Sequence, residues 1–150
     1  MKQSRGTAIL LSGLVFKEYL DNFDISIKEL EKLVKVYFDN DGFPLTRNPN
    51  DLIFFSKYLI LCKESIKDAQ QYVPEFLETI IDKNLRCIKS IQTPANQTPL
   101  FNGGNEDNLE QFDRYFDDLN YKSKDKKNMI GGIHAFRVRN NAVFFDVGEP

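Results

Sequence analysis

Three residues of this sequence stand at positions where their side chains could bind or move charge: Arg47, Asn48 and His134. The guanidinium of Arg47 is a planar fork that can pair with a carboxylate through two parallel hydrogen bonds. An arginine in a turn can equally fix the backbone by donating to carbonyl groups, and both interpretations stay open. Asn48 directly precedes Pro49, a pattern that favours a helix N-cap over a ligand-binding role.

His134 is the only histidine of the chain. The near-neutral pKa of an imidazole suits a residue that shuttles protons. However, the surrounding residues predict a strand, and on a strand His134, Phe136 and Val138 share one face. We therefore favour the simpler interpretation, in which His134 is a polar residue on an otherwise apolar sheet face.

Two further motifs resemble ligand-binding loops but lack essential residues. The segment from Asp39 to Gly42 is similar to part of a calcium loop, yet Tyr37 and Asn48 stand where carboxylates are required. The pairs at 103–104 and 131–132 are glycines without the strand-to-helix context of a phosphate-binding loop. We expect neither a metal nor a cofactor.

Composition argues against several classes of protein. The 150 residues carry a formal net charge of −2, unlike a nucleic-acid-binding domain with its strongly basic face. The apolar run near the N-terminus is interrupted by Lys17 and Glu18, and no cleavage site typical of a signal peptide follows it. The run is also shorter than the ~20 apolar residues of a membrane span, so we expect none.

The spacing of apolar side chains predicts four helices in the first 92 residues. The first covers residues 7–22. The second begins at Ser26, which would form a capping box with Glu29, and ends near Asn40.

The third predicted helix begins at Pro49, and the fourth runs from Pro74 to about Gln92. Apolar side chains between residues 52 and 61 cover nearly the whole circumference of the third helix. A helix of this kind is normally enclosed by neighbouring elements on several sides.

The character of the sequence changes after Gln92. Two prolines lie in a linker at 93–99, and a short acidic and aromatic segment follows at 107–119. Two apolar runs, Ile133–Val138 and Ala142–Val147, then flank Asn140-Asn141, a pair that suits a tight hairpin turn. An isolated hairpin is marginally stable, so this one either docks on the helices or belongs to a larger sheet.

Helices followed by strands predict an α+β fold. We divide the chain into a helical region, residues 1–93, and a region of linker and strands, residues 94–150.

Four segments occur in an order that resembles the heparinase II/III-like family, in particular its alphaproteobacterial version. They are the turn from Asp41 to Pro49, the segment Leu100–Gly104, and the two strand regions Gly131–Val138 and Val143–Pro150. Their counterparts in the family are a DGG…RNPS turn, an LFNG segment, a GYQRL-type strand and a V(D)xGPP strand end. The resemblance extends from about Asp41 to Pro150, with a weaker helical match before it.

The resemblance implies a large enzyme in which an α/α toroid of helical hairpins is followed by an antiparallel β-sandwich. This chain would supply the end of the toroid and the first strands of the sandwich. The remainder of the same polypeptide would then lie on both sides of it. For the compartment, the resemblance leaves the periplasm and the cytoplasm of a bacterium open.

Family members that are enzymes are polysaccharide lyases, a class of carbon–oxygen lyase that cleaves uronic-acid-containing glycans by β-elimination. The implied partner is therefore an acidic polysaccharide. β-Elimination requires a group that neutralises the substrate carboxylate, a base and an acid. By resemblance, Arg47 and His134 are candidate catalytic residues, and Arg47 and Asn48 are candidate substrate-binding residues.

The sequence departs from the lyases at one important position. The tyrosine of their (S/G)P-x-Y turn is absent, because Asn50 and Asp51 follow Pro49. A non-catalytic glycan-binding or structural relative therefore stays open, and so does a self-contained α+β interaction domain. We expect the chain by itself to be inactive, since it would supply only part of one cleft wall.

Overall fold

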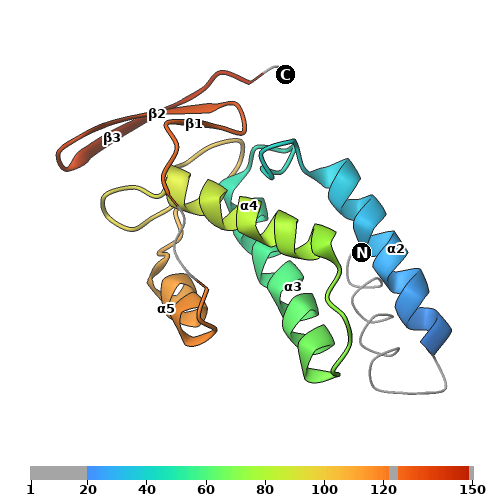
Figure 1. The fold of residues 1–150 in the computed structure, drawn as a ribbon. Helices are drawn as coiled ribbons and strands as arrows, with labels where there is room; N and C mark the ends of the chain where they lie inside the picture. Colours follow the sequence, from blue (N-terminus) through green and yellow to red (C-terminus); the bar gives the residue numbers. More distant parts are fainter. Residues whose placement is uncertain (1–19, 122–124, 149–150) are drawn as a thin grey trace. The chain divides into compact units, whose positions relative to one another are not determined.

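The computed structural model describes residues 20–121 and 125–148 (Figure 1). In these residues, four helices precede a three-stranded antiparallel sheet, which confirms the predicted α+β class. The elements are α2 (Leu20–Tyr37), α3 (Pro49–Asp68), α4 (Glu75–Ile91), α5 (Glu110–Asp118), β1 (Met129–Ile130), β2 (Ile133–Val138) and β3 (Asn141–Asp146). Within the described residues, no helix combines the length and the apolar character needed to cross a bilayer.

The chain groups into two compact units. The first comprises Met1–Tyr37 and Phe55–Ile81, and the second comprises Phe38–Phe54 and Asp82–Pro150. Both α3 and α4 contribute residues to each unit. The second unit therefore combines the loop before α3, the C-terminal part of α4, helix α5 and the sheet.

Helix α2 does not begin where the sequence predicts. Ser26 lies inside this helix, only 4% exposed, so the predicted helix start at Ser26 is wrong. Residues 20–27 contain no glycine or proline that would end a preceding helix, and a Ser-x-x-Glu pattern fits a helix interior as well as a cap. The first predicted helix, residues 7–22, lies almost entirely outside the described residues.

Helices α3 and α4 begin as predicted. The side-chain oxygen Oδ1 of Asn48 accepts a hydrogen bond from the backbone N–H of Asn50 at 2.8 Å, which confirms Asn48 as the N-cap of α3. Helix α3 is buried on part of its circumference, but Phe54 and Leu61 are 46% and 45% exposed. Helix α4 begins directly after Pro74, whose carbonyl accepts the N–H of Leu77 at 3.0 Å.

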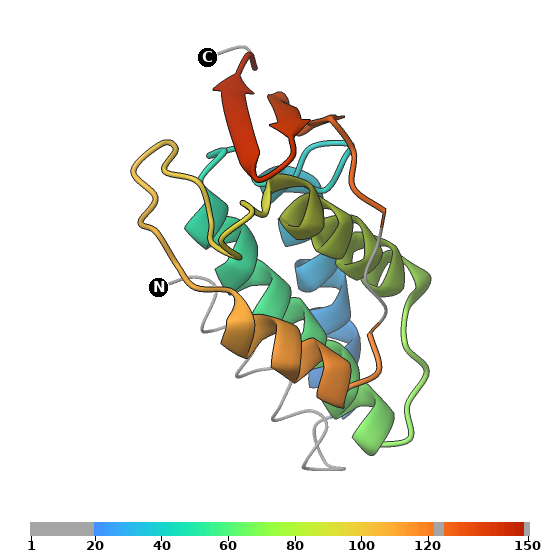
Figure 2. The same cartoon turned by 90° about the vertical axis from the view of Figure 1, so that its left-hand side faces the viewer.

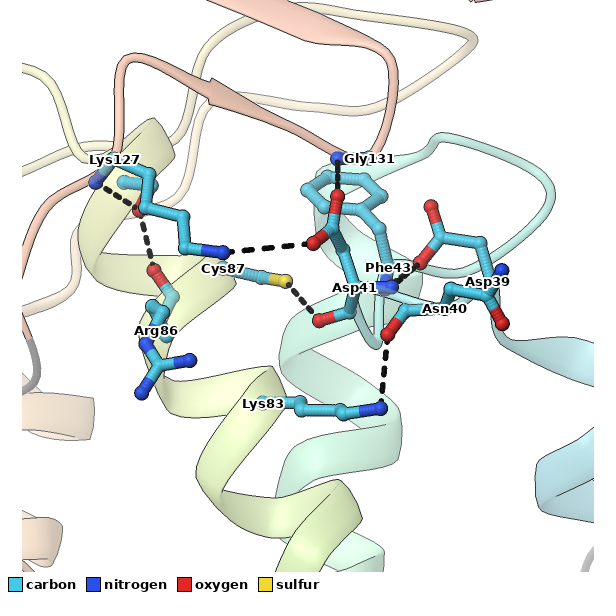
Figure 3. Close-up of polar contacts among 10 residues, drawn as sticks. Asp39, Asn40, Asp41, Phe43, Lys83, Arg86, Cys87, Lys127 and Gly131 are labelled. Atoms are coloured by element: carbon cyan, nitrogen blue, oxygen red, sulfur yellow. Dashed lines mark hydrogen bonds and ion pairs between the residues drawn. The ribbon is translucent and has the colours of Figure 1, made fainter.

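The loop between α2 and α3 is stabilised by its own aspartate and by α4 (Figure 3). Oδ1 of Asp39 accepts the backbone N–H groups of Asp41 and Phe43, at 2.9 Å and 2.8 Å. From α4, Nδ2 of Asn84 donates to the carbonyl of Gly42 at 2.6 Å, and Sγ of Cys87 to the carbonyl of Asp41 at 3.3 Å. The loop is thereby fixed on α4, with Phe43 completely buried.

The carboxylate of Asp41 joins this loop to the sheet. It accepts the backbone N–H of Gly131 at 3.2 Å and forms an ion pair with Nζ of Lys127 at 3.6 Å (Figure 3). Gly131 packs so closely on Phe43 that a Cβ atom would overlap the phenylalanine side chain.

The sheet contains one strand that the sequence analysis missed. Strand β1 pairs with β2 through a two-residue turn, Gly131-Gly132, in which both φ angles are positive, +57° and +74°. Such φ angles suit a type I′ hairpin turn. A strand of two residues shows no periodicity, but the Gly-Gly pair between apolar residues was itself a hairpin signal.

The hairpin of β2 and β3 forms with a turn one residue earlier than predicted. Val138 pairs with Asn141, so the turn residues are Arg139-Asn140 rather than Asn140-Asn141, and φ of Arg139 is +51°. The pairing places Ile133 and Ala135 on the buried face of the sheet. Because a slip of one residue would reverse the faces, burial of these side chains fixes the register.

We predict that Gly131→Ala destabilises the protein by about 3 kcal/mol, because left-handed backbone strain adds to overlap with Phe43. Gly103→Ala is the matched control: its φ is also positive, +79°, but nothing lies within 4 Å of the added Cβ. We expect this control to lower the free energy of unfolding by about 1 kcal/mol. Urea denaturation measures the free energy of unfolding of both variants, and equal losses would contradict the packing of Gly131 on Phe43.

Candidate functional site

Three segments that are distant in sequence meet around Arg47 in the second unit. Figure 2 shows the loop after α4 beside the start of α3. Arg47 lies in the turn before α3, Asn102 in the loop after α4, and Asp146 at the end of β3. Nε of Arg47 lies 3.0 Å from Oδ1 and 3.1 Å from Oδ2 of Asp146. Nδ2 of Asn102 donates to Oδ2 of Asp146 at 3.0 Å and to the carbonyl of Arg47 at 3.2 Å. We call Arg47, Asn48, Asn102 and Asp146 the Arg47 site.

The backbone at Arg47 and Asn102 has an uncommon conformation. Their φ angles are +49° and +46°, in the left-handed region that non-glycine residues rarely adopt. Asparagine tolerates this region, whereas for arginine it costs about 1 kcal/mol. The backbone N–H of Arg47 donates to the carbonyl of Pro44 at 2.8 Å, which closes the turn that presents the side chain. Non-glycine residues in such conformations cluster at functional sites.

A layer of asparagines connects the loop after α4 to the start of α3. Nδ2 of Asn48 donates to the carbonyl of Asn102 at 3.3 Å, while Asn50 contacts both Asn105 and Asp107 through its side-chain amide. A Cβ at Gly104 would come within 3.0 Å of the amide oxygens of both Asn48 and Asn50. Only glycine therefore lets the loop approach this closely. The sequence analysis assigned no role to Asn50 or Asn102.

The two charges at the Arg47 site form an ion pair that is partly exposed to solvent. The side chains of Arg47 and Asp146 are 24% and 23% exposed. Desolvation acts to raise the pKa of Asp146, but hydrogen bonds from Asn102, the N–H of Gly148 and Arg47 outweigh it and lower the pKa. Asp146 is therefore ionised at neutral pH. It contacts the Nε edge of the guanidinium of Arg47.

His134 does not belong to the Arg47 site. It pairs with Phe145 across the sheet, whereas Asp146 pairs with the buried Ile133, so His134 and Asp146 lie on opposite faces. The imidazole contacts the ring of Phe136 edge-on, with the ring centroids 5.8 Å apart. Of the three residues singled out from the sequence, the structure brings Arg47 and Asn48 together and leaves His134 apart.

Both cysteines are free thiols in the protein interior. Cys62 is 2% exposed and Cys87 fully buried, as expected of cysteines that act as small apolar residues. Burial raises the pKa of Cys62 to about 11 and raises the pKa of Cys87 further. Neither is a reactive thiolate at neutral pH. In residues 20–121 and 125–148, no group of three or more His, Cys, Asp or Glu side chains is arranged to hold a metal ion.

Comparison with known proteins gives no match to a family model, a curated protein or a solved structure. A function for this chain is therefore inferred from its own geometry and motifs.

We predict that Asp146→Asn lowers the free energy of unfolding at neutral pH by about 1 kcal/mol, because the Arg47 charge loses its partner. The folded-state pKa of Asp146 lies below that of an unfolded aspartate, about 3.9, so this stabilisation is present at higher pH and lost as pH falls through the folded pKa. Denaturation between pH 7 and 3 should show the difference between wild type and variant shrinking below about pH 4. A pH-independent difference would contradict the assigned ion pair.

Proposed function

We propose that this chain is part of a heparinase II/III-like protein and that the Arg47 site binds a carboxylate of a uronic-acid-containing glycan. One observation carries the proposal. Each residue comes from a different segment of the resemblance: Arg47 from the turn that ends at Pro49, Asn102 from Leu100–Gly104, and Asp146 from Val143–Pro150. The three residues form one hydrogen-bonded cluster. Motifs that were matched only by their order along the chain thus also meet in space, which supports a common site.

In this proposal, the helices form the end of an α/α toroid and the sheet forms the beginning of a β-sandwich. The supporting feature is the sheet face that carries His134, which we call the outer sheet face. Its apolar side chains are each more than half exposed: Met129, Phe136, Val138, Val143 and Phe145. A sandwich buries such a face against a second sheet. We propose that the same polypeptide continues on both sides of this chain and supplies that cover.

In this proposal, Arg47 supplies the first requirement of β-elimination. By pairing with the uronate carboxylate, its guanidinium would stabilise the negative charge that develops when the neighbouring C–H loses its proton. Asn48 and Asn102 would hold the turn and the carboxylate partner, Asp146, in place. Asp146 is a weak base because its pKa is lowered. The base and the acid would therefore come from the rest of the polypeptide.

A non-catalytic glycan-binding relative is the second candidate. Two observations favour it: Asp51 stands two residues after Pro49, where the lyases carry their tyrosine, and His134 lies on the opposite sheet face from Asp146. Binding through Arg47 is common to both candidates, and only proton transfer distinguishes them. The exposed outer sheet face also fits the third candidate, a self-contained interaction domain, because exposed apolar patches mark sites of protein–protein contact.

We predict that the longer polypeptide containing this chain releases unsaturated products from a polyuronate, measured as a rise in ultraviolet absorbance. Arg47→Ala should lower kcat/KM by about 100-fold, the usual effect of removing one charge-stabilising donor. Arg139→Ala, which removes an exposed arginine in the hairpin turn, is the matched control and should retain activity.

The outcomes separate the candidates. Polyuronate binding that depends on Arg47 without any product would establish the non-catalytic relative. Equal binding by wild type and Arg47→Ala would contradict both candidates. Loss of activity in His134→Gln would restore the sequence-based catalytic role of His134, and its retention would remove that role.

We predict that Phe136→Ala changes the free energy of unfolding of the 150-residue chain by less than about 1 kcal/mol, because the side chain is 57% exposed. In the longer polypeptide, the same substitution should cost about 3 kcal/mol, the usual cost of truncating a buried phenylalanine. Phe43→Ala, at a fully buried position, should be costly in both proteins. An equally small effect of Phe136→Ala in both would contradict the sandwich.

A further inference from the structure

Three cations from different segments gather at the C-terminal end of α4. Lys89 lies in the last turn of α4, Lys126 in the segment before β1, and Arg137 on β2. Ser90 joins the segments, because its hydroxyl accepts the N–H of Lys127 at 2.9 Å and its carbonyl accepts Nη2 of Arg137. We call Lys89, Lys126 and Arg137 the α4 cation cluster.

No carboxylate neutralises this cluster within the described part of the chain. Besides Ser90, Arg137 donates to the amide oxygen of Asn128 at 3.1 Å and to the carbonyl of Lys127 at 3.5 Å, both uncharged acceptors. Lys127 itself forms an ion pair with Asp41. Arg86, one turn before Lys89, adds a further positive charge, and Figure 3 shows its guanidinium pointing away from Asp41.

The hydrogen bonds of Ser90 hold together the segments that carry these cations. The pKa of Lys126 is lowered, first by burial and then by the charges of Lys89 and Arg137. The helix dipole explains a lysine in the last turn and an arginine on a terminal carbonyl. It does not explain Lys126, which lies on another segment.

We propose that the α4 cation cluster binds the sulfate or carboxylate groups of an anionic polysaccharide. The inference rests on the proposed function for the glycan nature of the ligand, but the cluster shares no residue with the Arg47 site. Duplex DNA, a polyanion of another class, serves as the competing ligand in the test.

The test measures binding of dextran sulfate and polygalacturonate to the 150-residue chain at fixed ionic strength. We expect Lys89→Gln/Lys126→Gln to weaken binding of at least one of the two by about tenfold. The control Lys28→Gln/Lys32→Gln removes two lysine charges on α2 and should change affinity less than twofold. Thermal unfolding verifies that both variants fold. In the wild-type chain, saturating polysaccharide should also raise the pKa of Lys126, measured by NMR.

Four results would overturn the proposal. Two concern the variants and the titration: an equal loss of affinity in both double variants, or an unchanged pKa of Lys126 at saturating polysaccharide. Two concern other ligands: tighter binding of duplex DNA than of either polysaccharide, or inorganic sulfate binding as tightly as dextran sulfate. Arg47→Ala separates this proposal from the previous one. If Arg47→Ala abolishes binding and the cluster variant does not, the α4 cation cluster is refuted and the Arg47 site stands. The reverse result supports the cluster and refutes the Arg47 site.

Discussion

The contact between the carboxylate of Asp41 and the backbone N–H of Gly131 fixes the sheet on the helical part of the second unit. It depends on a loop that is itself fixed on α4 by Asn84 and Cys87. Because Gly131 has no side chain, the first turn of the sheet approaches Phe43 directly. The position of the sheet follows from this short chain of contacts.

That position brings the end of β3 to Arg47. Asp146 lies 99 residues from Arg47 in sequence, yet their side chains form an ion pair that Asn102 completes from a third segment. Burial of the opposing Ile133 sets the register of β3, and the register decides that Asp146 faces Arg47. The same register places His134 on the other face. Packing thus determines which of the candidate residues can act together.

Local signals predicted the starts of α3 and α4. Asn48-Pro49 and Pro74 specify helix N-termini through backbone chemistry that needs no tertiary partner. The helix start predicted at Ser26 was wrong because a Ser-x-x-Glu pattern occurs both at helix N-termini and inside helices, and no glycine or proline before Ser26 distinguishes the two. The hairpin turn shifted by one residue because burial, rather than the preference of asparagine for turns, fixed the register.

The site was predicted only in part, for a physical reason. Arg47 and Asn48 stand in a recognisable turn, but Asn102 and Asp146 become partners only after the sheet docks. No periodicity or spacing in the sequence encodes that contact. The Gly-Gly turn and the LFNG segment were visible, and treating them as sites of close backbone approach would have pointed to the docking.

The central claim is that docking of the sheet couples Arg47 to Asp146. A double-mutant cycle with Arg47→Ala, Asp146→Ala and the combined variant measures this coupling directly in the free energy of unfolding. The account predicts that the two substitutions are non-additive, with a coupling of about 1 kcal/mol for this half-buried pair. Additive effects, with a coupling near zero, would show that the two side chains do not act together and would contradict the Arg47 site.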